Sequence, residues 1–253
     1  ADADLTGTSA RAQVSWLQIL RADLKRRWTA EIQVDYTMRE VERRDDARSL
    51  RDEKYPNLQL TSTNAPSFAP WGRKLTAEST LVLRKGFGGN EDTAGASRQD
   101  YLLAQPSLGF DLAWNDAWTS SLKTTAQISG EVVPEQEQFF LGGSDNVSAW
   151  LPGIAVGDEG YSARLAPSWT HEWRGRTVTP RLFVEHGGAR LRDARPGFAS
   201  QKLTDAGMEL AFEWSTWLEG SLAYALPLDD RGIDQGLLDR NEARLYFTIM
   251  AKM

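Results

Sequence analysis

The chain has 253 residues with 29 Lys and Arg against 35 Asp and Glu, and the resulting net charge of −6 argues against nucleic acid as a partner. It has no Cys, which excludes disulfides and thiolate metal sites. The first residues, ADADLTG, include neither a basic nor an apolar segment. We therefore expect that a signal peptide has been removed, or that the sequence starts inside a longer protein.

Stretches in which apolar and polar residues alternate recur about eleven times along the chain. A β-strand sends successive side chains to opposite faces, so each stretch predicts a strand with one apolar and one polar face. No stretch is apolar for long enough to cross a bilayer as a helix. Representative apolar positions, in chain order, are Val14, Trp16, Ile32, Val34, Leu58, Leu60, Leu81, Leu83, Leu108, Phe110, Leu122, Ile128, Leu165, Trp169, Leu182, Val184, Met208, Leu210, Leu222, Tyr224, Phe247 and Ile249.

The positions between these apolar residues carry many charges. Because a charged side chain needs water or an opposite charge, we expect this face to line a polar lumen. The charged and amide residues on it include Asp35, Arg84, Asp111, Lys123, Gln127, Arg164, Arg181, Glu185, Glu209 and Glu213. The pattern therefore predicts an all-β fold, an antiparallel transmembrane β-barrel with lipid outside and a polar interior.

Long and short connections alternate between the predicted strands. Long ones cover residues 44–56, 86–99, 135–158, 191–201 and 229–241, and short ones lie near residues 115–116, 174–175 and 215–216. Outer-membrane barrels combine short periplasmic turns with long outer loops. Pro56, Pro66 and Pro70 make residues 55–73 a poor strand region. We expect one domain, residues 1–253, with 11 to 12 strands, either a complete barrel or part of a larger one.

Two motifs resemble those of a transporter family. The first is Glu137–Gly143 (EQFFLGG), and the second is Gly157, Asp158, Gly160 and Tyr161. Together with Phe183 and Glu185 downstream, they resemble the signature of the two-partner secretion transporters, the haemolysin/haemagglutinin secretion-activation family of the Omp85 superfamily. Phe139 belongs to the first motif, and the resemblance spans roughly residues 74 to 253.

The resemblance implies a sixteen-strand outer-membrane barrel without cofactor or metal. It also implies that residues 135–158 fold into the lumen as a plug, with its tip formed by Leu141, Gly142, Gly143, Asn146, Val147, Ser148, Ala149 and Trp150. The expected partners are outer-membrane lipid, a secreted polypeptide, and the barrel assembly machinery, which would act on the C-terminal strand. Family members carry POTRA domains before the barrel, and this chain has no segment of that kind.

The loop tip departs from the family at one functional position. The family has V-R-G at the tip, and its Arg meets an acidic strand residue, whereas this chain has Val147-Ser148-Ala149. The acidic residue would be Glu185, and Arg164 or Arg181 could replace the missing Arg as its partner.

We therefore expect a non-enzymatic transporter that moves an unfolded adhesin or haemolysin across the bacterial outer membrane. One alternative is a passive pore or structural barrel without secretion activity, which the lost Arg and the missing POTRA domains favour. A less favoured alternative is a lipid-modifying enzyme that uses His171 or His186, because neither His lies in a recognisable catalytic motif. A soluble β-sandwich is the remaining alternative.

Overall fold

The computed structural model describes residues 5–43, 48–88, 99–144, 146–193 and 200–251. Its main feature is a 12-stranded antiparallel sheet in which eleven strands follow one path and β10 (His171–Trp173) pairs only with β11. In order, the eleven are β1 (Leu5–Asp23), β2 (Arg26–Arg43), β3 (Arg48–Phe68), β4 (Leu75–Gly86), β5 (Leu102–Ala113), β6 (Trp118–Ser129), β9 (Glu159–Trp169), β11 (Arg176–Arg190), β12 (Ser200–Ser215), β13 (Leu218–Arg231) and β14 (Leu245–Ala251). The predicted all-β fold and strand number are confirmed.

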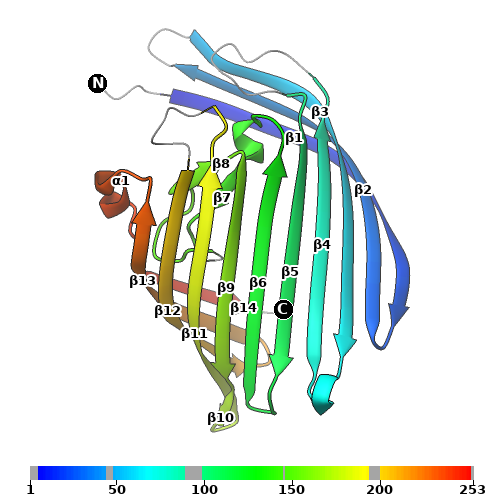
Figure 1. Ribbon diagram of the computed structural model, residues 1–253, viewed down its shortest axis with the longest axis vertical. Helices are drawn as coiled ribbons and strands as arrows, with labels where there is room; N and C mark the ends of the chain where they lie inside the picture. Colours follow the sequence, from blue (N-terminus) through cyan, green and yellow to red (C-terminus); the bar gives the residue numbers. More distant parts are fainter. Residues whose placement is uncertain (1–4, 44–47, 89–98, 145, 194–199, 252–253) are drawn as a thin grey trace.

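The sheet curves strongly, and its C-terminal strands β13 and β14 pass behind the central strands (Figure 1). Among the described strands, β1 pairs only with β2 and β14 only with β13, so these two form the edges. A short hairpin of β7 (Phe139–Leu141) and β8 (Ala155–Gly157) contacts β9 and β11. We call the face of the sheet that meets this hairpin the inner face and the opposite one the outer face.

The strand register separates apolar from charged residues. Leu165, Val184, Ala206 and Leu226 are direct cross-strand neighbours, and three of them are large, exposed aliphatic side chains on the outer face. The adjacent register row consists of Arg164, Glu185 and Asp205, which lie on the inner face. Alternation along each strand therefore places hydrocarbon on one face and charge on the other, as a barrel wall in a membrane requires.

The two ends of the sheet differ in their connections. Short turns join β1 to β2, β5 to β6, β10 to β11 and β12 to β13. Exposed Trp side chains gather near these turns: Trp114, Trp118, Trp169, Trp173, Trp214 and Trp217. The other end carries the longer connections, including the one that contains the six-residue helix α1 (Gln235–Arg240). Of the predicted long connections, those at 44–56, 86–99 and 191–201 lie partly outside the described residues.

The prediction that residues 55–73 are a poor strand region is wrong, because β3 runs without interruption through Pro56 and Pro66. For the same reason the predicted connection 44–56 is too long. The carbonyl of Pro56 accepts a hydrogen bond from Phe87, just past the end of β4, so its missing N–H also faces that end. Pro66 falls where the β3–β4 register skips from Asn64 to Ser67. Each proline thus lies where β4 offers no ladder partner.

The remaining elements are two single 3-10 turns, η1 (Pro70–Gly72) and η2 (Glu135–Glu137). Within the ranges that the structure describes, no helix combines the length and the apolar character needed to cross a membrane.

Candidate functional site

The tip of the 135–158 connection lies against the inner face of β11 and β12. The backbone N–H of Ser148 donates to Oε2 of Glu185 at 2.7 Å, and the N–H of Ala149 donates to Oδ2 of Asp205 at 2.6 Å. Both carboxyl groups are buried, with relative exposures of 1% for Glu185 and 0% for Asp205. Two adjacent backbone amides therefore meet two adjacent acidic residues, and the hydrogen bond to Glu185, which also pairs with a cation, is charge-assisted and stronger than a neutral one.

Arg164 is the arginine that pairs with Glu185. Its guanidinium lies 2.9 Å from Oε1 of Glu185 and 3.1 Å from Glu209, and it stacks 4.2 Å from the ring centre of Phe183. It also donates to the carbonyl oxygen of Ser144 in the loop at 3.2 Å. The positive charge thus comes from the wall strand β9, and it contacts both the acidic partner and the loop.

Arg181, the other predicted partner of Glu185, pairs instead with Glu209 at 3.0 Å. The register explains this, because Arg181 is cross-strand to Glu209 and lies four residues along β11 from Glu185. Of the two candidate replacements for the missing Arg, the geometry brings only Arg164 to Glu185.

The loop tip owes its shape to residues that tolerate unusual backbone angles. Gly142 and Gly143 have φ of 100° and 98°, a region that favours glycine, and a Cβ on Gly142 would lie 2.1 Å from the carbonyl oxygen of Leu151. The side-chain oxygen of Asn146 accepts from the N–H of Gly142 at 3.0 Å and closes the turn. Val147 also has a positive φ, 51°, and is fully buried. These residues build a compact tip whose backbone donors point at the wall.

Trp150 joins the tip to the last strand. Its side chain is buried, its carbonyl oxygen accepts from the Tyr246 hydroxyl at 2.8 Å, and its backbone forms an isolated bridge with Glu242. Leu141, Val147 and Trp150 pack in one apolar cluster with Leu238 of α1. The connection before β14 therefore also holds the loop, a contact that the sequence reading did not anticipate.

The family-motif residues fix the base of the hairpin. A Cβ on Gly157 would lie 2.5 Å from the backbone nitrogen of Arg190, and one on Gly160 would lie 2.2 Å from the ring of Phe139. Both positions therefore require glycine for close approach. The buried carboxylate of Asp158 accepts from the N–H of Val133 at 3.0 Å and from the N–H of Arg192 at 2.9 Å.

The other two motif residues lie on opposite faces of the sheet. The ring of Phe183 is buried on the inner face and lies over Gly207, where a Cβ would come within 2.4 Å of it. Tyr161 points to the outer face, and its hydroxyl lies 3.0 Å from Nε2 of His186.

A second anchor, absent from the sequence reading, holds the start of the same connection to the opposite part of the wall. Arg84 of β4 lies 2.9 Å from Glu137 in η2 and 3.1 Å from Asp35 of β2. It also donates to the hydroxyl of Tyr101 at 3.2 Å, and that hydroxyl donates to Asn57 at 2.8 Å. Burial raises the pKa of the Glu137 carboxyl above its ordinary value, and the nearby Arg84 charge lowers it only in part.

The connection is therefore fastened at two distant places, at β2 to β4 through η2 and at β9 to β12 through its tip. The sequence holds one signal of the anchor at η2, because Asp35 and Arg84 both lie on the predicted polar face. Their proximity to Glu137 depends on tertiary structure, because 49 residues separate Asp35 from Arg84.

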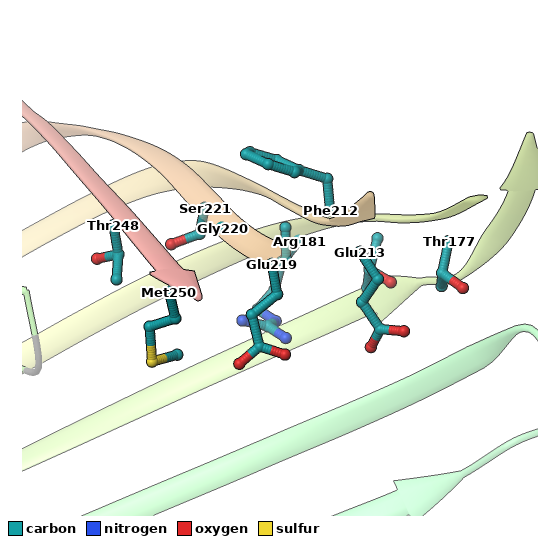
Figure 2. Close-up of a pocket in the computed structure, with 11 residues that line it drawn as sticks. Thr177, Arg181, Phe212, Glu213, Glu219, Gly220, Ser221, Thr248 and Met250 are labelled. Carbon is teal, nitrogen blue, oxygen red and sulfur yellow. The ribbon is translucent and has the colours of Figure 1, made fainter. Parts of the chain in front are cut away.

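Two hollows lie along the inner face. One, of about 640 Å³, is bordered by Ser144 of the loop together with Lys123, Arg164, Glu209 and several Ser and Thr side chains. The other, of about 260 Å³, lies nearer the short turns (Figure 2). Figure 2 shows Arg181, Glu213 and Glu219 on one side of the ribbon and Phe212 on the other. Hydroxyl and charged groups thus line the hollow beside the loop. In the hollow near the short turns, the ring of Phe212 lies on the opposite side of the ribbon from the charged groups.

Among the described residues, no group of three or more His, Asp or Glu side chains is arranged to hold a metal ion.

No family model matches the sequence, and no curated protein matches it significantly. Among solved structures, CdiB from Escherichia coli aligns with a TM-score of 0.75 at 18% identity, over 97% of this chain and 45% of that one. CdiB from Acinetobacter baumannii aligns with a TM-score of 0.69 at 13% identity, over 97% of this chain and 42% of that one. The chain thus spans less than half the length of these structures. The chain therefore has the fold of these two CdiB structures over nearly its whole length, and the predicted antiparallel β-barrel architecture is confirmed.

Proposed function

We propose that this protein lies in the bacterial outer membrane and translocates an unfolded secreted polypeptide of the adhesin or haemolysin type. The observation that carries the proposal is the doubly anchored loop on a charged inner face, in a sheet with the fold of CdiB. A polar lumen lowers the cost of passing a hydrated polypeptide backbone, since unpaired peptide groups are costly in apolar surroundings. The apolar outer face supports the membrane location.

We propose further that the 135–158 connection is the plug of this pore. Its tip is held by hydrogen bonds to Glu185 and Asp205 and by the contact of Arg164 with Ser144. These contacts are polar and can be exchanged for water or for backbone groups of a passing chain, which suits a gate. The proposed assembly partner, the barrel assembly machinery, would act through β14, the edge strand at the C-terminal side of the sheet.

Single-channel recording tests the plug. Deleting residues 144–153 removes the tip and leaves β7 and β8 in place, so the conductance of the protein in planar bilayers should rise. A deletion of the same length at residues 89–98, in the connection between β4 and β5, is the matched control and should leave the conductance near the wild-type value. Equal conductance of wild type and tip deletion would exclude the plug.

A secretion assay tests the translocation itself. Cells that express the protein with a large secreted partner polypeptide should release that polypeptide, and release should fail when the protein is absent. The second candidate function is a passive pore, which the replacement of the family's loop Arg by Ser148 favours. Ion conductance without any polypeptide release would select the passive pore.

The predicted absence of enzyme activity is part of the proposal. Nε2 of His186 lies 3.0 Å from the Tyr161 hydroxyl and Nδ1 lies 2.9 Å from the Thr204 hydroxyl, while His171 packs against Trp169. Both nitrogens of His186 thus have hydroxyl partners, and within the described residues neither nitrogen bonds to a carboxylate that would orient the ring as a general base. We expect His186→Ala and His171→Ala to leave phospholipid and lipid A unchanged in membranes that contain the protein.

A further inference from the structure

The outer face changes character in regular steps toward the end with the long connections. Each row consists of three cross-strand neighbours, one each from β9, β11 and β12. The first row is apolar and consists of Leu165, Val184 and Ala206. The next three rows are Ala163, His186 and Thr204, then Tyr161, Gly188 and Lys202, and finally Glu159, Arg190 and Ser200. Apolar side chains thus give way to aromatic and hydroxyl groups and then to cations. This order is the one expected where a barrel wall leaves the hydrocarbon and enters the headgroup layer.

The third and fourth rows enclose a groove of about 290 Å³ on this face. Its floor is Gly188, which has no side chain, and the ring of Tyr161 covers one side so closely that a Cβ on Gly188 would lie 2.8 Å from it. Ile128 of β6 contributes an apolar wall, and Lys202 and Arg190 contribute cations. The groove therefore offers apolar contact below and positive charge at the rim.

The charges around the groove do not balance. Arg190 and Arg192 both pair with the single carboxylate of Glu159, so one positive charge of the three groups is left over. Lys202 is exposed, and within the described part of the chain it makes no hydrogen bond or ion pair. Among the residues that line the groove, the two cations Arg190 and Lys202 face the single acid Glu159, so the lining carries a net charge of +1 in a chain whose net charge is −6.

The groove lies beyond the apolar rows of the outer face, on the side of the long connections. Lys202 lies four residues along β12 from Ala206, which corresponds to roughly 13 Å along the strand and about 10 Å along the bilayer normal for a strand tilted by 35–45°. The headgroup layer begins at the edge of the hydrocarbon, and a Lys side chain can extend along the wall to place its charge there. Phosphate is the anion at this depth, and basic pockets on membrane proteins bind anionic headgroups.

We propose that this groove binds the phosphate group of an acylated, phosphorylated glycolipid in the outer leaflet, with an acyl chain on Ile128 and Tyr161 and the phosphate on Lys202 and Arg190. The long connections at this end of the sheet assign it to the outside of the cell. The proposal depends on the outer-membrane location proposed above but not on polypeptide secretion.

Native mass spectrometry of the purified full-length protein in detergent tests the groove, with diphosphorylated lipid A and its fully dephosphorylated form as probes. The wild type should bind the phosphorylated probe more tightly. Lys202→Gln should weaken this binding about fivefold and Lys202→Glu about 25-fold, since each unit of charge near a membrane surface changes the affinity by about fivefold. Lys202 makes no hydrogen bond or ion pair with the described residues, so neither variant removes such a contact.

Lys25→Gln, at an exposed lysine in the turn between β1 and β2, is the matched control and should bind like the wild type. Unchanged affinity of both Lys202 variants, or equal binding of the two probes by the wild type, would overturn the proposal. Displacement of lipid A by inorganic phosphate at the same concentration would overturn it as well, because the site would then hold a free anion.

Co-flotation with phosphatidylcholine vesicles separates this failure from that of the location. A protein that does not float with these vesicles would overturn both the outer-membrane location and the groove. A protein that floats but shows no preference for the phosphorylated probe would overturn the groove alone.

Discussion

At the scale of single residues, the loop tip is held by acidic side chains that accept backbone hydrogen bonds. Glu185 and Asp205 are cross-strand neighbours, so their register alone brings two carboxyl groups together under the amides of Ser148 and Ala149. Arg164 supplies the compensating charge from β9. The cation that meets Glu185 thus comes from a strand of the wall and not from the loop tip.

Replacing Glu185 by Ala should release the tip. It removes the acceptor of Ser148 and leaves Arg164 with Glu209 as its remaining acidic partner, and breaking a buried pair of this kind costs about 3–5 kcal/mol. We expect open-channel events in planar bilayers to become frequent and the segment around Ser144 to become sensitive to protease. Glu213→Ala, at an inner-face glutamate that lines the hollow near the short turns, is the control. A closed, protected loop in the Glu185 variant would contradict this role.

The buried Glu137 predicts a pH dependence of loop docking with an unexpected sign. Burial raises the pKa of its carboxyl in the docked state, whereas in an undocked loop that pKa would return to the ordinary value of about 4.3. The docked state therefore binds the proton more tightly, so docking strengthens as the pH falls through the raised pKa and gains nothing more below the ordinary value. A simple ion-pair argument based on Arg84 would predict the opposite.

The measurement is the closed-state probability of single channels between pH 7 and pH 4. It should rise in the wild type as the pH falls, and Glu137→Gln should flatten this part of the curve. Glu131→Gln, between β6 and η2, should keep the wild-type slope. The opposite result would be a closed-state probability that decreases as the pH is lowered, and that does so only when Glu137 is present. It would show that the predicted sign of the pH dependence is wrong.

At the scale of elements, the hairpin of β7 and β8 packs against β9 and β11 at positions occupied by glycine. A Cβ on Gly187 of β11 would lie 2.6 Å from Leu141 and 3.2 Å from Val147, so the hairpin approaches the wall because that position is glycine. Gly157 and Gly160 have the same role at its base. The positions of these glycines in the sequence thus determine where the β7–β8 hairpin can pack closely against the inner face of the sheet.

Substituting Gly187 by Ala should therefore push the hairpin from β11. Overpacking a tight contact costs about 1–3 kcal/mol, and we expect that loss in the free energy of unfolding, measured by Trp fluorescence in guanidinium with the protein in detergent. Gly109→Ala is the matched control in the same sheet, because a Cβ there would have its nearest neighbour at 3.9 Å. Equal stability of the two variants would show that the hairpin does not depend on this contact.

At the scale of the whole molecule, the sheet has one apolar face and one charged face. Phe110, Leu210 and Phe247 are exposed on the outer face, while Asp111, Lys123 and Glu209 border the hollow inside. A soluble sandwich would bury its apolar face against a second layer, and the outer side chains in the described ranges are instead exposed. This arrangement argues against the soluble alternative.

An arginine placed on the outer face should accordingly resist insertion. Leu210→Arg should lower the free energy of folding into lipid vesicles by up to about 2–4 kcal/mol, the cost at the bilayer midplane, and by less if the residue lies near an interface. Thr248→Arg, on β14 beside the inner hollow, should cost far less because its charge would face water. Equal costs would mean that the two faces do not meet different solvents.

The sequence by itself determined the strands, their two faces and the loop motifs, because alternation and close-packing glycines are local properties of the chain. It did not determine β3, where Pro56 and Pro66 are tolerated only because β4 leaves those positions without partners. Only the tertiary structure decided which cation meets Glu185, since that choice depends on cross-strand register rather than on proximity in the chain. The anchor of Asp35, Arg84 and Glu137 likewise arises because sheet curvature brings distant strands to one loop, and no local pattern records that curvature.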